Sequence, residues 1–237
     1  MKKNTLVILQ ARMSSKRLPG KVLLMINGEP MIYWQIKRIL RSKLISKLIV
    51  AISEENSDDV LANYLDEIKQ EYIRGSLGNV LDRFAKVEKI YKPEAIVRLT
   101  GDCPLVMPDL IDSLVDMFYK KQVDYLSNTI NLTFPDGLDI EVIKPGVLEK
   151  LTEHNLSNSE KEHVTLGIIN RENLFSMSNY SNDKNLSHYR WTVDTIQDFE
   201  FVTKVFEHFK LNEENFTFEE LKKFIDDNPE INRISNR

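Results

Sequence analysis

Four cationic side chains stand within ten residues near the start of the chain, with no acid among them: Arg12, Lys16, Arg17 and Lys21. Like charges at this density repel one another, so the loop needs either full solvation or an anionic partner. A triphosphate is such a partner, because Arg grips phosphate oxygens with a planar fork and Lys acts as a point charge. The segment is not a Walker P-loop, since a Gly-Lys-Ser/Thr ending is missing. A solvated basic loop is the alternative interpretation.

Two aspartates, Asp102 and Asp194, each lie near the end of a mainly apolar segment later in the chain. Asp is a common cap where a strand turns into a helix, so capping explains either residue taken alone. Together, opposite the basic loop, the two carboxylates suit a cation that also binds phosphate. We do not expect Cys103 to act as a nucleophile, because no Cys/His pair is visible in the local sequence.

The composition of the 237-residue chain is that of a folded protein with a sizeable core. It contains 42% hydrophobic and 29% charged residues, and its single cysteine suits a reducing compartment. These figures exclude a collagen, a disordered tail and a disulfide scaffold. No apolar run approaches the roughly 20 residues of a membrane span, and the run at 6–9 is too short for a secretory signal. We therefore expect a cytoplasmic protein with no membrane partner.

The formal net charge of −4 hides a strong asymmetry along the chain. Residues 1–50 carry a charge of +10, and the rest of the chain carries −14. An acidic protein with a basic first fifth indicates a local anion site rather than a surface that coats nucleic acid. The sequence therefore predicts a small anionic ligand and no nucleic-acid partner.

Short apolar segments rich in branched residues alternate with amphipathic segments over the first half of the chain. We predict strands at 5–10, 48–52, 72–74, 95–99 and 123–127, and helices at 30–40, 53–68, 79–91 and 108–119. This alternation is typical of an α/β fold with a mainly parallel sheet and helices on both faces. Ligands of such sheets bind beyond the carboxyl ends of the strands. The loops after Gln10, Leu99 and Val193 should therefore meet at one edge.

The pattern loosens after residue 128. We predict a turn at 135–137, strands at 138–143 and 188–193, and helices at 145–151, 160–170, 196–209 and 218–225. Neither an internal repeat nor a low-complexity linker is visible. We therefore expect one domain over 1–237, with 129–187 as an insertion or cap.

The motifs at these positions resemble the signature of the cytidylyltransferases that make CMP-activated acidic sugars. The segment at 11–21 reads Ala-Arg-x-x-Ser-x-Arg-Leu-Pro-Gly-Lys, and Ile-Asn-Gly-Glu-Pro-Met follows at 26–31. Two further motifs of the family follow in the same order along the chain, Gly-Asp-x-Pro at 101–104 and Val-Asp-Thr at 193–195. The resemblance spans about 5–205 and is strongest to the branch named for spore coat polysaccharide biosynthesis protein F. It implies a single Rossmann-like, GT-A-like nucleotidyltransferase domain and a homodimer.

The resemblance also implies a nucleotide site and a metal site. Four residues would form the catalytic set, of which Arg12 and Lys21 bind the CTP phosphates, and Asp102 and Asp194 hold Mg²⁺. Further nucleotide contacts are expected from Ala11, Ser14, Arg17, Arg74, Ser76, Arg83 and Thr100. For the segment at 74–83, an ordinary strand–helix turn capped by Asn79 is the alternative. Thr100 departs from the Gln that sugar-acid members often place before Gly-Asp.

Candidate acceptor-binding residues lie in the second half of the chain. They are Asp139, Glu141, Glu162, His163 and Arg190. Asp139 and Glu141 alternate with apolar residues on a predicted strand, so both face one side, and that side is either the acceptor or water. The acceptor-binding blocks of the 3-deoxy-manno-octulosonate enzymes are not recognisable at 129–187, so the acceptor stays open.

The expected activity is Mg²⁺-dependent transfer of CMP from CTP to a small acidic sugar, with release of pyrophosphate. One alternative is a nucleotide-sugar-dependent glycosyltransferase of GT-A-like fold, with Asp102 holding the metal on a diphosphate. The four-cation loop with its Pro-Gly-Lys ending suits a triphosphate better. The other alternative is a non-enzymatic scaffold, which would have no reason to keep Arg12, Lys21, Asp102 and Asp194 together.

Overall fold

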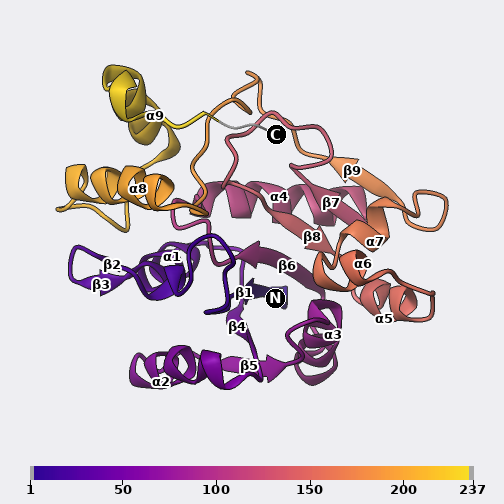
Figure 1. Ribbon diagram of the computed structural model, residues 1–237. Coiled ribbons are helices and arrows are strands. Elements are labelled where there is room, and N and C mark those ends of the chain that lie inside the picture. Colours follow the sequence, from indigo (N-terminus) through magenta and orange to yellow (C-terminus); the bar gives the residue numbers. More distant parts are fainter. Residues whose placement is uncertain (1–2, 235–237) are drawn as a thin grey trace.

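A seven-stranded sheet runs through the middle of the molecule in the order β5-β4-β1-β6-β8-β7-β9 (Figure 1). The computed structural model describes residues 3–234. The strands are β1 (Thr5–Gln10), β4 (Lys47–Ser53), β5 (Tyr72–Gly75), β6 (Ala95–Thr100), β7 (Tyr125–Ser127), β8 (Glu141–Ile143) and β9 (Met177–Asn179). Neighbours among β5, β4, β1 and β6 pair in parallel, whereas β8 pairs antiparallel with both β6 and β7. The predicted α/β class with a mainly parallel, mixed sheet is confirmed.

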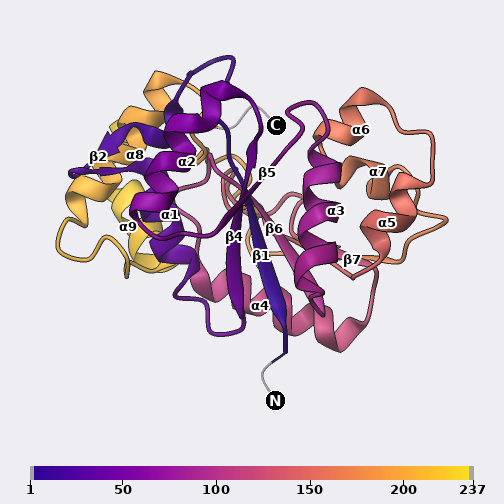
Figure 2. The ribbon, with the colours of Figure 1, turned by 90° about the horizontal axis from the view of Figure 1, so that it is seen from below.

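Helices cover both faces of this sheet (Figure 2). The helices are α1 (Met31–Ile39), α2 (Asp59–Glu67), α3 (Val80–Tyr91), α4 (Pro108–Lys121), α5 (Val147–Thr152), α6 (Asn158–Glu162), α7 (Leu166–Ile169), α8 (Ile196–His208) and α9 (Phe218–Asp227). One core layer packs α1, α2 and α4 on the sheet, and a second packs α3, α5 and α7 on the other face. A third apolar cluster joins α8 and α9 to the start of α1. The short strands β2 (Met25–Ile26) and β3 (Glu29–Pro30) form a separate hairpin.

The central strand β1 is buried on both faces, as its continuous apolar sequence predicts. Val7 and Leu9 belong to one core layer, and Leu6 and Ile8 to the other. All four side chains are at most 1% exposed. This strand ends where the basic loop begins, so a rigid element fixes the start of that loop.

Three predicted elements differ in the structure. The strand predicted at 138–143 is confined to β8 (Glu141–Ile143), so Asp139 lies before it. Residues 188–193 were expected to form a strand, but among residues 3–234 the segment pairs only through isolated bridges, from Arg190 to Asp136 and from Tyr189 to Ile234. The predicted helix at 160–170 is broken into α6 and α7, since Val164 between them has a positive φ of 33°. Contacts with distant segments decide the last two outcomes, and such contacts cannot be read from the local hydrophobic periodicity of the sequence.

The segment 129–187 contributes two strands to the main sheet. It supplies β8, which lies between β6 and β7, and β9, which lies at the end of the strand order. The segment is therefore built into the fold rather than laid over it. Within residues 3–234, none of the helices is long and apolar enough to cross a membrane.

Candidate functional site

Three loops converge on the ammonium group of Lys21 at the carboxyl ends of β1 and β6. Lys21 Nζ lies 3.1 Å from Asp102 Oδ2 and 3.1 Å from Asp194 Oδ1. It also donates a 2.7 Å hydrogen bond to the backbone carbonyl of Val193. The prediction that the loops after Gln10, Leu99 and Val193 meet at one edge is therefore confirmed.

The basic loop is folded so that Lys21 points inward. The carbonyl of Met13 accepts hydrogen bonds from the backbone of Ser15 and of Gly20, at 2.9 and 2.8 Å, which curls the loop. Gly20 adopts a φ of 72°, a conformation that glycine takes at little cost. Burial alone would lower the pKa of Lys21, but Asp102 and Asp194 outweigh it and raise the pKa. The Lys21 side chain is therefore a charged ammonium, although it is only 9% exposed.

Asp102 is held as an ionised carboxylate beside a neutral thiol. Burial raises the pKa of Asp102, but the charge of Lys21 and several hydrogen bonds outweigh burial and lower it. The Cys103 thiol lies 3.5 Å from Asp102 Oδ1, and burial together with this carboxylate raises the thiol pKa. A protonated, buried thiol is a poor nucleophile. This agrees with the expectation that Cys103 carries no chemistry.

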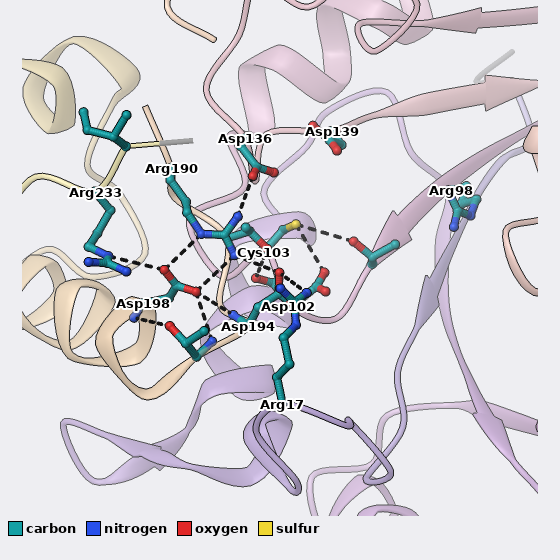
Figure 3. Close-up of a pocket in the computed structure, with 14 residues that line it drawn as sticks. Arg17, Arg98, Asp102, Cys103, Asp136, Asp139, Arg190, Asp194, Asp198 and Arg233 are labelled. Atoms are coloured by element: carbon teal, nitrogen blue, oxygen red, sulfur yellow. Dashed lines mark hydrogen bonds and ion pairs between the residues drawn. The ribbon is translucent and has the colours of Figure 1, made fainter. Parts of the chain in front are cut away.

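Asp194 is contacted by three cations, of which Figure 3 shows Arg17 and Arg190. In addition to Lys21, Arg17 and Arg190 each lie 2.8 Å from Asp194 Oδ2. Arg190 also pairs with Asp136 at 2.8 Å and with Asp198 at 3.0 Å. Arg190, predicted to bind the acceptor, is therefore engaged by three carboxylates and orients Asp194.

Asp198 fixes the backbone that carries Asp194. It is the third residue of α8 in a capping box with Thr195. Its Oδ2 accepts hydrogen bonds from the backbone N–H groups of Asp194 and Thr195, at 3.1 and 3.0 Å. A helix cap thus sets the direction of the Asp194 carboxylate.

We expect Asp198→Asn to destabilise the fold by about 2 kcal/mol near neutral pH. Burial raises the pKa of Asp198, but hydrogen bonds from Arg190 and the backbone outweigh it and lower the pKa from 3.8 to about 2. Because the folded pKa is depressed, this stability is present above 3.8 and is lost as pH falls through about 2.

Urea unfolding measured between pH 7 and pH 2 tests this. The wild type should lose stability faster than Asp198→Asn over the acidic part of the range. Asp227→Asn is the control, because Asp227 is exposed on α9 and pairs only with Lys223 among the described residues. Parallel pH profiles for wild type and Asp198→Asn would contradict the role of this carboxylate.

Three adjoining cavities surround this cluster, and their linings overlap. The loop cavity, of about 440 Å³, lies against the basic loop and is lined by Ala11, Arg12, Arg17, Lys21, Glu162 and His163 among others. The aspartate cavity, of about 650 Å³, is lined by Asp136, Asp139, Arg190, Asp194 and Arg233 among others. The helix cavity, of about 420 Å³, lies against α7 and is lined by Leu132, Asp139, Glu141, His163 and Ile169 among others. Asp102 lines the first two cavities.

Most of the predicted phosphate-binding side chains come together in the loop cavity. Arg12 and Lys21 line it from the basic loop, and Thr100 lines it from β6. Arg12 pairs with Glu162 at 3.1 Å, so α6 closes the cavity opposite the loop. Ser14 does not line it, and its hydroxyl is buried without a partner in the described part of the chain.

The three residues predicted on the segment at 74–83 lie elsewhere. Arg74 forms a 2.6 Å ion pair with Asp59. Arg83 is completely buried and donates to the carbonyl of Ala51 at 3.3 Å. Neither these two residues nor Ser76 lines any of the three cavities. Asn79 caps α3 through Asp82, as the turn interpretation expects.

The predicted acceptor residues separate into two groups. Asp139 and His163 line the cavities, as does Glu162. Glu141 also lines the helix cavity, but its carboxylate pairs with Arg98 and accepts a 2.6 Å hydrogen bond from the Tyr125 hydroxyl. Glu141 is only 6% exposed, so the alternative in which its side chain faces water does not hold for this residue.

Sequence reasoning missed Arg98 and Asp136, which both line the aspartate cavity. A charged residue inside an apolar strand was the available signal for Arg98, since the segment reads Ala-Ile-Val-Arg-Leu-Thr at 95–100. Asp136 lies in the turn sequence Pro-Asp-Gly at 135–137, where an Asp is common for structural reasons alone. The residues at 233–234 reach the same cavity from the far end of the chain.

The donor set around Lys21 fits a divalent cation that is completed by substrate. The carboxylates of Asp102 and Asp194 each lie 3.1 Å from Lys21 Nζ, so both face the same point, where the Lys21 ammonium lies between them. Among residues 3–234, no group of three or more His, Cys, Asp or Glu side chains forms a complete metal site. Mg²⁺ commonly takes one or two carboxylates and draws its remaining ligands from phosphates and water.

Comparison with known proteins agrees with this geometry. The family model described as Cytidylyltransferase matches residues 6–232. The spore coat polysaccharide biosynthesis protein SpsF of Bacillus subtilis is 35% identical over 85% of this chain and 86% of its own length. A 3-deoxy-manno-octulosonate cytidylyltransferase of Haemophilus influenzae is 33% identical over 62% of this chain and 56% of its own length. The structure of a cytidylyltransferase from Leptospira borgpetersenii superposes with a TM-score of 0.92 at 33% identity, covering 99% of this chain and 98% of that one.

Proposed function

This chain belongs to the cytidylyltransferase family, and we propose that it transfers CMP from CTP to a small acidic sugar with release of pyrophosphate. The observation that carries the proposal is the position of Lys21, which joins the basic loop to Asp102 and Asp194. Cations for a triphosphate and carboxylates for a divalent ion thus meet at one point. We propose Mg²⁺ as that ion.

The triphosphate is expected in the loop cavity. Arg12, Arg17 and Lys21 line it and supply three positive charges that are already in place. Charge develops on the leaving pyrophosphate as the bond between the α-phosphorus and the bridging oxygen breaks. Cations fixed before the reaction stabilise that charge without reorganising, which lowers the barrier.

The acceptor is expected in the aspartate and helix cavities, which share Asp139. Its hydroxyl attacks the α-phosphorus and forms the new P–O bond as the bond to pyrophosphate breaks, and its proton passes to solvent water. Mg²⁺, when bound, neutralises phosphate charge and lowers the pKa of the attacking hydroxyl. Asp102 lines both the loop cavity and the aspartate cavity, which supports a role for it between the two proposed substrates.

Pyrophosphate release tests this function directly. Each common nucleoside triphosphate is incubated with a panel of sugar acids and sugar phosphates, with Mg²⁺ or with a chelator. We expect release only with CTP, a sugar acid and Mg²⁺. A parallel set of incubations replaces the triphosphate by nucleotide-sugars. Consumption of a nucleotide-sugar, with no pyrophosphate release from any triphosphate pairing, would identify a glycosyltransferase, and inactivity in both sets would favour a scaffold.

Arg12→Ala is expected to raise the KM for CTP by roughly 10- to 100-fold, because one charge-assisted phosphate contact is lost. Arg12 is partly exposed and pairs only with Glu162 among the described residues, so the fold should persist. Initial rates at varied CTP concentration measure the effect. Arg41→Ala is the control, since it removes the same charge from the same basic stretch outside the three cavities. Equal KM values in Arg12→Ala and Arg41→Ala would place the triphosphate elsewhere.

We also propose that the chain forms a homodimer through the segment 129–187. This segment carries β9, at the end of the strand order, and exposed apolar side chains at Ile169 and Leu174. Light scattering measures the mass in solution. A monomer at concentrations well above those used in the assay would contradict the proposal.

A further inference from the structure

The last residues that the structure describes form one wall of the aspartate cavity. We call residues 232–234 the C-terminal strap, and two of them, Arg233 and Ile234, line that cavity. The strap follows a short 3₁₀ helix (Pro229–Ile231) that comes after α9. Neither Arg233 nor Ile234 lines the loop cavity or the helix cavity. A contribution of the strap to the site therefore belongs with the proposed acceptor and not with the triphosphate.

The strap is docked by its backbone on the extended segment that precedes α8. The N–H of Arg190 donates a 2.7 Å hydrogen bond to the carbonyl of Arg233, and an antiparallel bridge joins Tyr189 to Ile234. Ile231, which lies two residues before Arg233, packs against the third apolar cluster. Backbone pairing and an apolar anchor thus place the Arg233 side chain without using its guanidinium.

The Arg233 guanidinium keeps most of its hydrogen-bond donors available. Within residues 3–234, only its Nε contacts a carboxylate, Asp198 Oδ1 at 3.4 Å. The neighbouring Arg190 is instead engaged by Asp136, Asp194 and Asp198. A guanidinium carries five N–H donors, and four of them are on the two terminal nitrogens. Arg233 can therefore donate to a ligand in the cavity while it keeps its contact with Asp198.

The charges that line the aspartate cavity show why this arginine matters for an anionic acceptor. Among the described residues, acids outnumber bases, because the lining contains five aspartates and four arginines. Removal of Arg233 would leave three arginines against the same five aspartates. Like charges repel more strongly in a partly buried cavity than in water, so the deficit would weaken binding of a negatively charged molecule. The nine side chains are Arg17, Arg98, Asp102, Asp136, Asp139, Arg190, Asp194, Asp198 and Arg233.

Arg233 lies away from the groups that are expected to react. Figure 3 shows it beyond Asp198, on the opposite side from Asp102. Asp102 lines both the loop cavity and the aspartate cavity, so we expect the attack on the α-phosphorus beside it. An acceptor that extends from Asp102 toward the strap would place its far end, and not its attacking hydroxyl, against Arg233.

We propose that the C-terminal strap is part of the acceptor site, and that Arg233 binds oxygen atoms at the end of the acceptor remote from its attacking hydroxyl. This inference rests on the proposed function. Hydroxyl and carbonyl oxygens accept hydrogen bonds, and the planar guanidinium can donate to two neighbouring oxygens at once. Arg233 lies beyond residues 6–232, which match the family model, so this role does not follow from family membership. Arg233 is therefore a specificity-determining residue that favours acceptors long enough to reach the strap.

Steady-state kinetics with two acceptor lengths test this role. The probes are the sugar acid that gives the fastest pyrophosphate release with CTP and an analogue that lacks its terminal hydroxymethyl group, measured as a substrate or as a competitive inhibitor. We expect Arg233→Gln to raise the KM for the full-length acid roughly 10-fold, and to weaken binding of the shortened analogue less than about twofold. The turnover number and the KM for CTP should stay within about twofold of wild type.

A purely structural role of Arg233 would give a different result. Loss of its contact with Asp198 could only act by displacing Asp194, which would change the turnover number and the Mg²⁺ requirement for both acceptors alike. Arg233→Lys keeps the charge and should recover part of the affinity for the full-length acid. Arg41→Gln is the matched control, because it removes the same charge outside the three cavities, and it should behave as wild type.

Two outcomes would overturn the proposal. One is an unchanged KM for the full-length acid in Arg233→Gln, and the other is an equal loss of affinity for the two acceptor lengths. The partly exposed position of Arg233 makes the variant suitable for this comparison, since little buried structure depends on its side chain. Absence of pyrophosphate release with every acid would instead overturn the proposed function, and this inference with it.

Discussion

We expect replacement of Asp102 by Asn to lower the turnover number roughly 1,000-fold, because it would remove several kcal/mol of charge stabilisation from the transition state. The wild-type carboxylate is ionised, since Lys21 and hydrogen bonds lower its pKa against the effect of burial. It lines both the loop cavity and the aspartate cavity, and it lies 3.1 Å from Lys21 Nζ. Asn keeps the shape of this side chain and one oxygen ligand, but it carries no negative charge for a divalent ion.

Pyrophosphate release at saturating CTP and acceptor measures the loss, and a Mg²⁺ titration identifies its cause. The Mg²⁺ concentration for half-maximal rate should rise in Asp102→Asn, while the thermal unfolding temperature stays close to that of wild type. Asp116→Asn is the matched control, because that exposed carboxylate lies on α4 and pairs with Lys120. A wild-type rate with an unchanged Mg²⁺ response would show that Asp102 is only a turn residue.

The sheet and the edge that carries the site could be predicted because they depend on local patterns. The strand at 5–10 has the predicted bounds, and its continuous apolar sequence matches its burial on both faces. Once the strands are parallel, geometry alone brings the loops after β1 and β6 together. For this reason the sequence correctly placed Lys21 opposite Asp102, although they are 81 residues apart.

The ion pairs within the site could not be predicted in the same way. Arg190 looked free to bind an anion, but Asp136, Asp194 and Asp198 surround it from different parts of the chain. Arg98 was missed because its partner Glu141 lies on an antiparallel strand that reaches β6 only after a long connection. Hydrophobic periodicity indicates which face of a helix or strand is apolar. It does not indicate which charged side chain of a distant segment will contact that helix or strand.

The broken strand at 188–193 shows the same limit at the level of the backbone. Its residues alternate as a strand should, but the N–H of Trp191 bonds to Asp136 and that of Arg190 to Arg233. Partners on two separate segments satisfy the backbone without a continuous ladder. The result is an extended segment that delivers Asp194 to the site without belonging to the sheet.

Lys21→Met is expected to lower both stability and turnover, because this ammonium is the cation shared by the two carboxylates. Its removal leaves Asp102 and Asp194 facing each other and the carbonyl of Val193 without its hydrogen bond. Breaking a buried charge cluster by removing one member typically costs about 3–5 kcal/mol. Arg17 and Arg190 still neutralise Asp194, so we expect about 2–3 kcal/mol in the free energy of unfolding.

The double variant Lys21→Met with Asp102→Asn separates the two effects. Removing one carboxylate relieves the repulsion, so stability in urea should return part of the way to wild type, while turnover stays low.

Mg²⁺ should raise the unfolding temperature of Lys21→Met more than that of wild type, because a divalent ion can take over the neutralisation of both carboxylates. The Lys21 pKa is raised, so its contribution is fully present below pH 10.5 and is lost only as pH rises through the raised value. No response of Lys21→Met to Mg²⁺ would mean that the carboxylates hold Lys21 in place and do not bind the ion.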